Sequence, residues 1–428
     1  MACCQSFLKH VCSIWRRSNS CPRILARCRS HPFVHPSLVY KKDLCSLAHE
    51  PDASSHGPRR AASQNSANNI IATDRVLFAN QFVNTNDAKD REPELNTGRV
   101  MLVDGTSIIY RAYYKLLAKL HHGHLENADG NGDWVLTIFT ALSLLIDVLE
   151  FIPSHVVVVF DHDGNSFPQS SYAPRRNVAA KGLNFRHTLY PAYKSNRPPT
   201  PDTIVQGLQY LKASIKAMNV RVIEVPGVEA DDVIGTLAVR SIEAGFKVRV
   251  VSPDKDFFQI LSPSLRLLRI APRGMDMVSF GMEDFAKKYD NLKPSQFVDV
   301  MALVGDKSDN IPGVEGIGNV HAVKLISKFG TLERVLERVD EVAEERIRNA
   351  LKSNSDTAIL SKNLALLRSD LPYYMVPFAI GDLLFRRPED NGEKFTSLLT
   401  AMSAYAEGFS ADPIIRRALY LWKKLERR

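Results

Sequence analysis

Four acidic positions stand out because each follows an apolar run with the composition of a β-strand. These positions are Asp104, Asp161, Glu229 and Asp254. A single acidic residue after a strand is usually a helix cap or a turn residue. Four such positions, two of them with further acids beside them, instead favour one shared carboxylate site.

The further acids lie in two short strings, Glu229-Ala230-Asp231-Asp232 and Asp254-Lys255-Asp256. Glu229 could cap the helix that it opens, and acids in a first turn suit the helix dipole. That alternative explains one or two of the three acids. Carboxylates a few ångströms apart repel one another strongly, so cations must neutralise a cluster of this size. Oxygen-only ligands favour Mg²⁺ or Mn²⁺, whereas zinc would bring His or Cys ligands.

A third acidic motif covers residues 305–310 (GDKSDN) and contains Asp306 and Asp309. A Gly-rich turn at 313–318 (GVEGIG) follows it and leads into a helical pattern. Turns of this kind present backbone N–H groups to a phosphate. A plain helix-turn-helix packing unit fits the glycines equally well. Because this turn directly follows two acids, we favour its interpretation as a clamp for a DNA backbone.

The segment 165–200 is basic and aromatic, and no acid lies between Asp163 and Asp202. Its cations and rings include Arg175, Arg176, Lys181, Arg186, His187, Tyr190, Tyr193, Lys194 and Arg197. Cations hold phosphates and rings stack on bases, so this composition suits a single nucleic-acid strand. A solvated basic loop is the alternative. The position of the segment between the second and third acidic positions favours the functional interpretation.

The elements that must position these residues alternate along the chain. Strands are predicted at 99–103, 155–160, 220–225, 247–251 and 265–270, and helices at 134–150, 203–218 and 230–244. Several strand-like runs are apolar on both faces, as buried parallel strands require. The pattern predicts an α/β fold with a mostly parallel sheet flanked by helices. Ligands bind at the carboxyl ends of such strands, where the four acids lie.

Composition separates the first part of the chain from the rest. The 428 residues carry a formal net charge of +8, but residues 1–92 hold 13 Lys and Arg against 7 Asp and Glu. All six cysteines lie at or before Cys45, so the body has no disulfide framework and no thiol nucleophile. No run of about 18 apolar residues is free of charge, so no membrane-spanning helix is expected.

The first 45 residues are Arg-rich and Ser-rich, and Asp43 is their first acid. This composition is typical of an organelle transit peptide, for a mitochondrion or a chloroplast. A basic disordered tail that binds nucleic acid is the alternative. We expect a disordered linker at 46–98.

In order and spacing, the motifs resemble the 5′-nuclease domain of bacterial DNA polymerase I, a family related to phage 5′-exonucleases and flap endonucleases. The matching strings are LVDGTSIIYRAYY at 102–114, VVVFD at 157–161, FRHTLYPAYKSNRPPTP at 185–201, VPGVEADDVIGTLA at 225–238, SPDKDFFQIL at 252–261 and GDKSDNIPGVEGIG at 305–318. The resemblance covers roughly residues 99–375. It implies a PIN-like nuclease domain at 99–290 with a basic arch at 165–200, and a helix-hairpin-helix subdomain at 291–375.

The resemblance also implies roles for individual residues. Two Mg²⁺ ions would be held by Asp104, Asp161, Glu229, Asp231, Asp232, Asp254, Asp256, Asp306 and Asp309. Among the catalytic residues, Lys194 would approach the scissile phosphate, Arg186 would be a further cation of the arch, and Tyr110 would stack near the active site. The residues in contact with DNA would be Arg197, Tyr193, Gly313, Gly316, Ile317 and Gly318, with a K⁺ ion often bound at such a hairpin turn. The segment 165–184 looks longer than the bacterial counterpart. No polymerase domain follows, and residues 376–428 are expected to form a helical tail.

The implied function is a 5′-3′ exonuclease or flap endonuclease that cuts DNA at 5′ flaps, nicks and free 5′ ends. RNA–DNA hybrids are further possible substrates, and an organellar DNA polymerase acting in trans is the expected partner of a monomer. Two alternatives stay open: a structure-specific DNA-binding protein that is catalytically weak, and a nuclease of organellar RNA processing.

Overall fold

The computed structural model describes residues 98–121, 132–162, 184–271 and 277–427. The predicted transit peptide, nearly all of the predicted linker and residues 165–183 of the basic segment lie outside the described residues. Across the described residues, no helix has the length and apolar character needed to cross a membrane.

A six-stranded sheet forms the centre of the molecule, in the order β3-β2-β1-β4-β5-β6. The strands are β1 (Arg99–Asp104), β2 (His155–Val159), β3 (Arg221–Ile223), β4 (Lys247–Val251), β5 (Leu265–Ile270) and β6 (Met277–Phe280). The first five pair in parallel, and β6 pairs antiparallel with β5. The predicted mostly parallel α/β fold is confirmed.

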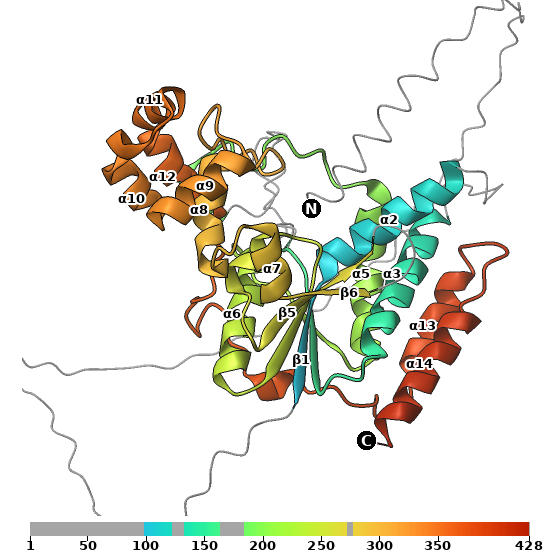
Figure 1. Ribbon diagram of the computed structural model, residues 1–428. Helices are drawn as coiled ribbons and strands as arrows, with labels where there is room; N and C mark the ends of the chain where they lie inside the picture. Colours follow the sequence, from blue (N-terminus) through green and yellow to red (C-terminus); the bar gives the residue numbers. More distant parts are fainter. Residues whose placement is uncertain (1–97, 122–131, 163–183, 272–276, 428) are drawn as a thin grey trace, which may run out of the picture. The chain divides into compact units, whose positions relative to one another are not determined.

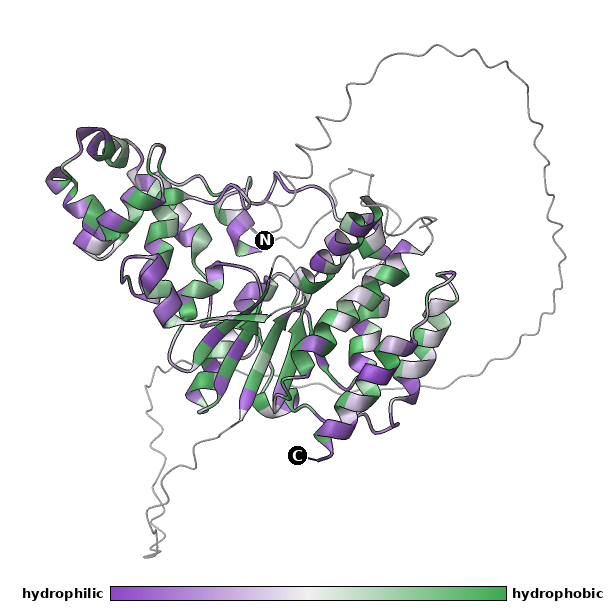
Figure 2. Cartoon of the chain, turned by 45° about the vertical axis from the view of Figure 1, so that its right-hand side comes forward, coloured by the Kyte–Doolittle hydropathy of each residue, from purple (hydrophilic) through white to green (hydrophobic). Residues whose placement is uncertain are grey.

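Both faces of the sheet are buried, which explains the continuous apolar runs. Along β1, Val100 and Leu102 join one core, while Met101 and Val103 join the other. Successive side chains of a strand point to opposite faces, so a strand between two layers must be apolar at every position. Figure 2 shows this apolar character concentrated in the central strands.

Helices cover the two faces of the sheet (Figure 1). One core holds the apolar residues of α2 (Gly105–His121), α3 (Asp133–Leu149) and α5 (Asp202–Ala217). The other holds those of α6 (Ala230–Glu243) and the short 3₁₀ turn η1 (Asp256–Ile260). The short helix α4 (Phe185–Leu189) precedes α5.

A helical subdomain follows the sheet and shares the core that contains α6. Its elements are α7 (Met282–Lys288), η2 (Pro294–Gln296), α8 (Phe297–Val304), α9 (Asn319–Phe329), α10 (Leu332–Glu337), η3 (Val339–Glu341), α11 (Glu345–Ser353) and α12 (Ser355–Ala365). At the turn after α8, a side chain on Gly313 would collide with the Gly305 backbone, and both residues have positive φ. These two positions therefore require glycine.

The last helices are part of the sheet domain. After η4 (Ile380–Leu383), α13 (Glu393–Ser403) and α14 (Asp412–Leu425) enter the core that contains α3 and α5. Trp422 is 1% exposed there and contacts the Phe395 ring edge-on at 5.7 Å. The helices predicted for this end of the chain therefore belong to the core of the sheet domain. Residue types alone had not indicated this role.

Most of the predicted elements are present, with end points shifted by one or two residues. The structure adds elements that the sequence did not predict, among them α2, α4 and β6. The α2 helix begins immediately after β1 without an intervening loop, so no turn signal marks its start. The short edge strand β6 has the burial pattern ieei, which offers little apolar alternation to detect.

Candidate metal and nucleic-acid site

The carboxylates lie at the carboxyl edge of the parallel strands, as predicted. Asp104 is the last residue of β1, Asp161 follows β2 by two residues, and Asp254 follows β4 by three. Because β1 lies between β2 and β4, these three strand ends are neighbours. The first turn of α6 adds Asp231. Four acids from four segments thus converge on one edge.

Hydrogen bonds hold two of these carboxylates in place. Asp104 accepts the Ser107 backbone N–H at 2.9 Å through Oδ1 and the Ser252 hydroxyl at 2.9 Å through Oδ2. Asp161 accepts the backbone N–H of Ala230, the first residue of α6, at 2.9 Å. The start of this helix therefore orients one carboxylate while it carries Asp231 itself.

Burial and mutual repulsion change the pKa values of these carboxyl groups. Burial, with repulsion from Asp161, raises the pKa of Asp104 to about 6 from its ordinary 3.8. Burial raises the pKa of Asp231 well above its ordinary value, and Asp254, Asp104 and Asp161 raise it further. Like charges in a buried site disfavour ionisation. Burial opposes ionisation of Asp254 as well, but the Asp256 backbone N–H, Lys255 and Lys194 outweigh it and lower the pKa of Asp254 to about 2.

A second set of acids surrounds Asp256. Burial raises its pKa well above the ordinary value, with Asp254 and Asp309 adding to the rise. Its Oδ1 is buried and accepts no hydrogen bond. Buried polar atoms are almost always satisfied, so an orphaned carboxylate oxygen indicates a missing partner. With oxygen donors only, the residues fit a hard divalent cation such as Mg²⁺ or Mn²⁺.

Cations of the chain occupy part of the predicted ligand set. The Lys194 ammonium lies 2.7 Å from Glu229 Oε1 and 3.7 Å from Asp309 Oδ2. Burial opposes ionisation of Glu229, but Lys194 and Arg186 outweigh it and lower the pKa of Glu229 to about 2. Arg197 pairs with the other oxygen of Asp309. Glu229 and Asp309 are therefore neutralised by the chain itself.

The nine predicted ligands thus fall into two groups. Asp104, Asp161, Asp231, Asp254 and Asp256 face one another, whereas Glu229, Asp232, Asp306 and Asp309 pair with Lys or Arg. Within the described ranges, no three His, Cys, Asp or Glu side chains are close enough together to hold an ion as they stand. Repulsion among the five acids of the first group and attraction of the other four to cations both favour this arrangement.

Arg186, which was expected to be a catalytic cation of the arch, pairs with a carboxylate of the chain. Its guanidinium is buried and donates to both carboxylate oxygens of Asp232, at 2.6 and 2.8 Å. It also donates to the carbonyls of Leu364 and Leu366, at 3.0 and 2.8 Å. Arg186 is a positioning residue, and Asp232 is its partner instead of a metal ligand.

Tyr193 requires a similar correction. The ring was expected to contact DNA, but it is 3% exposed. Its hydroxyl lies 3.3 Å from Glu229 Oε2 and 3.3 Å from Asp309 Oδ2, so it bridges two carboxylates. The next residue, Lys194, has a φ of 56°, a conformation that side chains rarely adopt. Its backbone N–H donates to the Asp309 carbonyl at 2.8 Å, which holds this turn.

The four DNA contacts predicted at the hairpin turn fall into a buried pair and an exposed pair. Gly313 is buried, with its N–H on the Ser361 hydroxyl at 3.0 Å, and Ile317 is 5% exposed. These two residues are structural, because packing removes them from any ligand. Gly316 and Gly318 are exposed, and Gly318 caps α9. Only the exposed pair remains available to a backbone phosphate.

Tyr110 lies on α2, half-buried, with its hydroxyl 3.4 Å from the Thr200 hydroxyl. It therefore links α2 to the residues just before α5. Lys255, which no motif analysis singled out, lies 3.0 Å from Asp306.

Several supporting residues were absent from the sequence reading. Ser252 donates to Asp104 and accepts the Asp254 N–H at 3.1 Å. Asn184 donates to Glu229 at 2.6 Å, and Asn310 donates to the Ala192 carbonyl at 2.7 Å. Small polar residues beside acidic motifs were the available signal, but their partners are distant in sequence.

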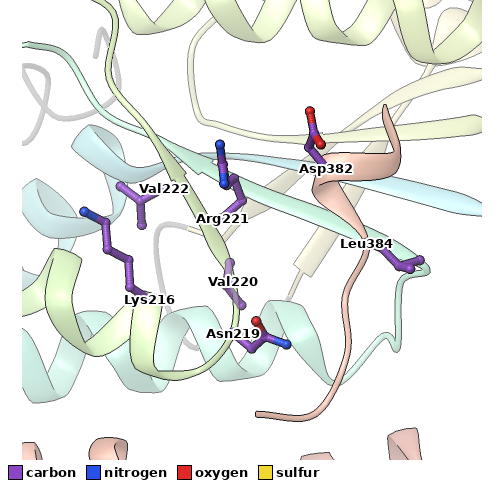
Figure 3. Close-up of a pocket in the computed structure, with 7 residues that line it drawn as sticks. All are labelled: Lys216, Asn219, Val220, Arg221, Val222, Asp382 and Leu384. Carbon is purple, nitrogen blue, oxygen red and sulfur yellow. The ribbon is translucent and has the colours of Figure 1, made fainter. Parts of the chain in front are cut away.

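A cavity of about 430 Å³ lies away from this carboxylate edge. It is lined by the end of α5, the start of β3 and residues near η4 (Figure 3). It contains no member of the acidic site.

The parallel sheet, the acids at its carboxyl edge and the attached helical hairpin define a PIN-like nuclease fold. Comparison with known families gives two consecutive matches. Residues 99–290 match "5'-3' exonuclease, N-terminal resolvase-like domain", and residues 292–391 match "5'-3' exonuclease, C-terminal SAM fold". The chain belongs to the 5′-3′ exonuclease family.

Curated relatives agree with this assignment. DNA polymerase I of Bacillus caldotenax is 35% identical over 289 residues, which are 67% of this chain and 30% of that protein. The thermostable DNA polymerase I of Thermus thermophilus is 36% identical over 276 residues, 64% of this chain and 29% of the other. The chain thus spans less than a third of these relatives' length. The solved T5 D15 protein, co-crystallised with metal ions, is 19% identical with a TM-score of 0.49, covering 72% of this chain and 100% of that chain.

Proposed function

We propose that this protein is a metal-dependent 5′-3′ exonuclease and flap endonuclease that hydrolyses phosphodiester bonds at DNA 5′ ends and flaps. One observation carries the proposal: Asp104, Asp161, Asp231 and Asp254 lie at the same edge of the sheet, where burial and repulsion from the other three raise the pKa of Asp231 well above its ordinary value. A folded chain tolerates such repulsion only where function requires it. A DNA-binding protein without activity would have no use for these acids.

The residues of the chain have separable tasks in this reaction. Asp104, Asp161, Asp231, Asp254 and Asp256 would hold two divalent ions, which when bound supply an activated water and neutralise charge on the phosphate. Ser252 and the Ala230 N–H keep Asp104 and Asp161 oriented toward that site. The leaving group is the 3′ oxygen, so the product carries a 5′-phosphate.

Lys194 is the cation placed to stabilise the transition state. Its side chain is 17% exposed, and its ammonium pairs with Glu229. A preorganised cation beside developing negative charge costs no reorganisation during the reaction. We assign Lys194 to the scissile phosphate, with Arg197 on the neighbouring phosphate and Tyr110 beside the first base.

We further propose that the protein acts in an organelle, in DNA replication, primer removal and repair. The Arg-rich first 45 residues support import, and the relatives combine this domain with a polymerase that would here act in trans. We expect a monomer, and a K⁺ ion at the turn with Gly316 and Gly318. Fusion of residues 1–98 to a fluorescent protein tests the location. Diffuse cytosolic fluorescence would refute import.

Cleavage of labelled substrates tests the reaction itself. The purified protein should cut 5′-flap and nicked DNA with Mg²⁺ or Mn²⁺ and should be inactive with a chelator. Asp254→Asn with Asp256→Asn should abolish cleavage and still bind the flap substrate. Full activity in that variant would refute the two-metal assignment. Preference for an RNA strand over DNA in the same assay would favour the organellar RNA-processing alternative.

A further inference from the structure

A set of exposed cations lies away from the acidic site and has no role in the proposed reaction. We name it the basic flank, and it consists of Lys216, Arg221, Arg386, Arg416, Lys423 and Arg427. Among the described residues, none of these six side chains forms an ion pair, although many other Lys and Arg residues do. Unpaired cations that gather on one surface leave a local positive potential.

Helix α14 and the turn that follows it contribute half of the basic flank. Arg416 and Lys423 are seven residues apart, so at 3.6 residues per turn they share one exposed face of the helix. Arg427 is exposed two residues after the last residue of the helix. The opposite face is buried through Ala418 and Trp422, so the helix is fixed and its cations project outward.

The other half continues this surface past the end of α14. Arg387 pairs with Glu426 near the end of that helix. Asn219 donates to the carbonyls of residues 386 and 387, at 3.2 and 3.3 Å. These contacts bring the end of α14 close to the cavity of Figure 3. Lys216 and Arg221 line that cavity together with one carboxylate, Asp382.

The basic flank differs in place and origin from the hairpin subdomain. Figure 1 shows α13 and α14 on the opposite side of the sheet from α8 to α12. The α14 helix also follows the last residue matched by the exonuclease family, residue 391. Lys216 and Arg221, at the end of α5 and the start of β3, lie away from the carboxylate edge. The basic flank is therefore separate from the site of the proposed reaction.

We propose that the basic flank binds the phosphate backbone of duplex DNA outside the active site. This inference rests on the proposed function for its ligand. Protein–nucleic acid interfaces are polar and strongly positive, whereas a stable protein interface needs an apolar centre. The exposed apolar side chains of α14 are only Leu419 and Tyr420, and Lys424 covers the Tyr420 ring at 4.5 Å. The flank therefore fits a polyanion better than an acidic protein.

Salt-dependent binding of the full chain tests this inference. We would measure the affinity for a flap duplex with long arms, in chelator so that no cleavage occurs, for wild type and for R416E/K423E/R427E. Loss of three phosphate contacts should reduce the slope of log affinity against log salt by about 3 and weaken binding on the order of 10²-fold at low salt. A matched variant, K247E/K287E/K293E, reverses three exposed cations elsewhere and should keep the slope within about 1 of wild type.

Two outcomes would overturn the inference. One is an unchanged slope and affinity in the α14 variant. The other is an equal loss in the matched variant, which would indicate only net charge. Cleavage is scored separately, on a flap substrate with arms too short to leave the carboxylate edge. Both variants should cut it like wild type. A wild type that cuts nothing would refute the proposed function while the binding comparison still stands.

Discussion

Arg186 donates to both carboxylate oxygens of Asp232, and both side chains are almost completely buried. The same guanidinium reaches two backbone carbonyls, at Leu364 and Leu366, just where α12 ends. Asp232 neighbours Asp231, whose pKa burial and the nearby Asp254 raise well above its ordinary value. A single buried ion pair therefore joins the end of the hairpin subdomain to the helix that carries a metal-ligand candidate.

We expect this pair to be costly to break from one side only. Arg186→Leu should destabilise the protein by about 3–5 kcal/mol, because Asp232 keeps a buried charge without a partner. Arg186→Leu combined with Asp232→Leu should recover most of the loss. Urea unfolding of the four proteins measures the coupling. The exposed Arg266–Glu283 pair is the control and should give a coupling below about 1 kcal/mol. A coupling equally small at Arg186 would contradict this prediction.

Removing one charge from the acidic group should stabilise the metal-free protein. Asp231→Asn keeps the shape of the side chain and relieves repulsion from Asp254 and Asp104. We expect a gain of roughly 0.5–2 kcal/mol, the usual size of a stability gain made at the cost of function. Thermal unfolding in chelator measures it, and Mg²⁺ should stabilise wild type more than this variant. A destabilised Asp231→Asn protein would argue against uncompensated charge.

The pH dependence follows from Asp104. Burial raises its pKa from 3.8 to about 6, so the folded metal-free protein holds a proton that the unfolded chain releases. This contribution to stability is complete below pH 3.8 and is lost as the pH rises through about 6. Mg²⁺ must displace the proton, so its affinity should rise between about pH 5 and about pH 7. Calorimetry in two buffers would detect the released proton, and Asp104→Asn should release fewer. Affinity independent of pH would refute this assignment.

Lys194 combines a functional charge with an unfavourable backbone conformation, and two substitutions separate them. Lys194→Met removes the charge and keeps the φ of 56°, whereas Lys194→Gly also relieves the strain. Both should lower kcat by on the order of 10²–10³. The glycine variant should be more stable than the methionine variant by about 1 kcal/mol. Equal stabilities would show that the turn is unstrained, and normal kcat in either variant would remove Lys194 from the reaction.

The last helix should be indispensable for folding. Trp422→Ala should cost about 3–5 kcal/mol because the indole is buried against Phe395 and other core residues. Tyr420→Ala, on the exposed face two residues earlier, should change stability by less than about 0.5 kcal/mol. Chemical unfolding of both variants measures the difference. If Trp422→Ala left the free energy of unfolding nearly unchanged, the last helix would be dispensable for folding.

Much of the fold could be predicted because its signals are local. Apolar runs such as 155–160 predict buried strands, and acids after them predict a shared edge, since parallel strands end together. These signals were enough for the sheet and for the meeting of Asp104, Asp161 and Asp254. The antiparallel strand β6 was missed because short edge strands carry weak patterns.

The division of the acids depended on contacts between distant residues. Sequence spacing made Glu229 and Asp231 equivalent, yet Lys194 neutralises one and leaves the other exposed to repulsion. Arg186 and Tyr193 are residue types that often contact nucleic acid, but here both side chains are buried and donate to carboxylates of the chain.

The sequence alone therefore determined the class of fold, the family and the edge of the sheet where chemistry occurs. Those properties depend on residue type and short-range periodicity, which are written directly in the chain. Only the tertiary structure decided which acids keep their charge, which cations are buried and that α14 belongs to the core. Those properties depend on which distant side chains share a low-dielectric environment, where a single partner within about 4 Å changes the charge balance.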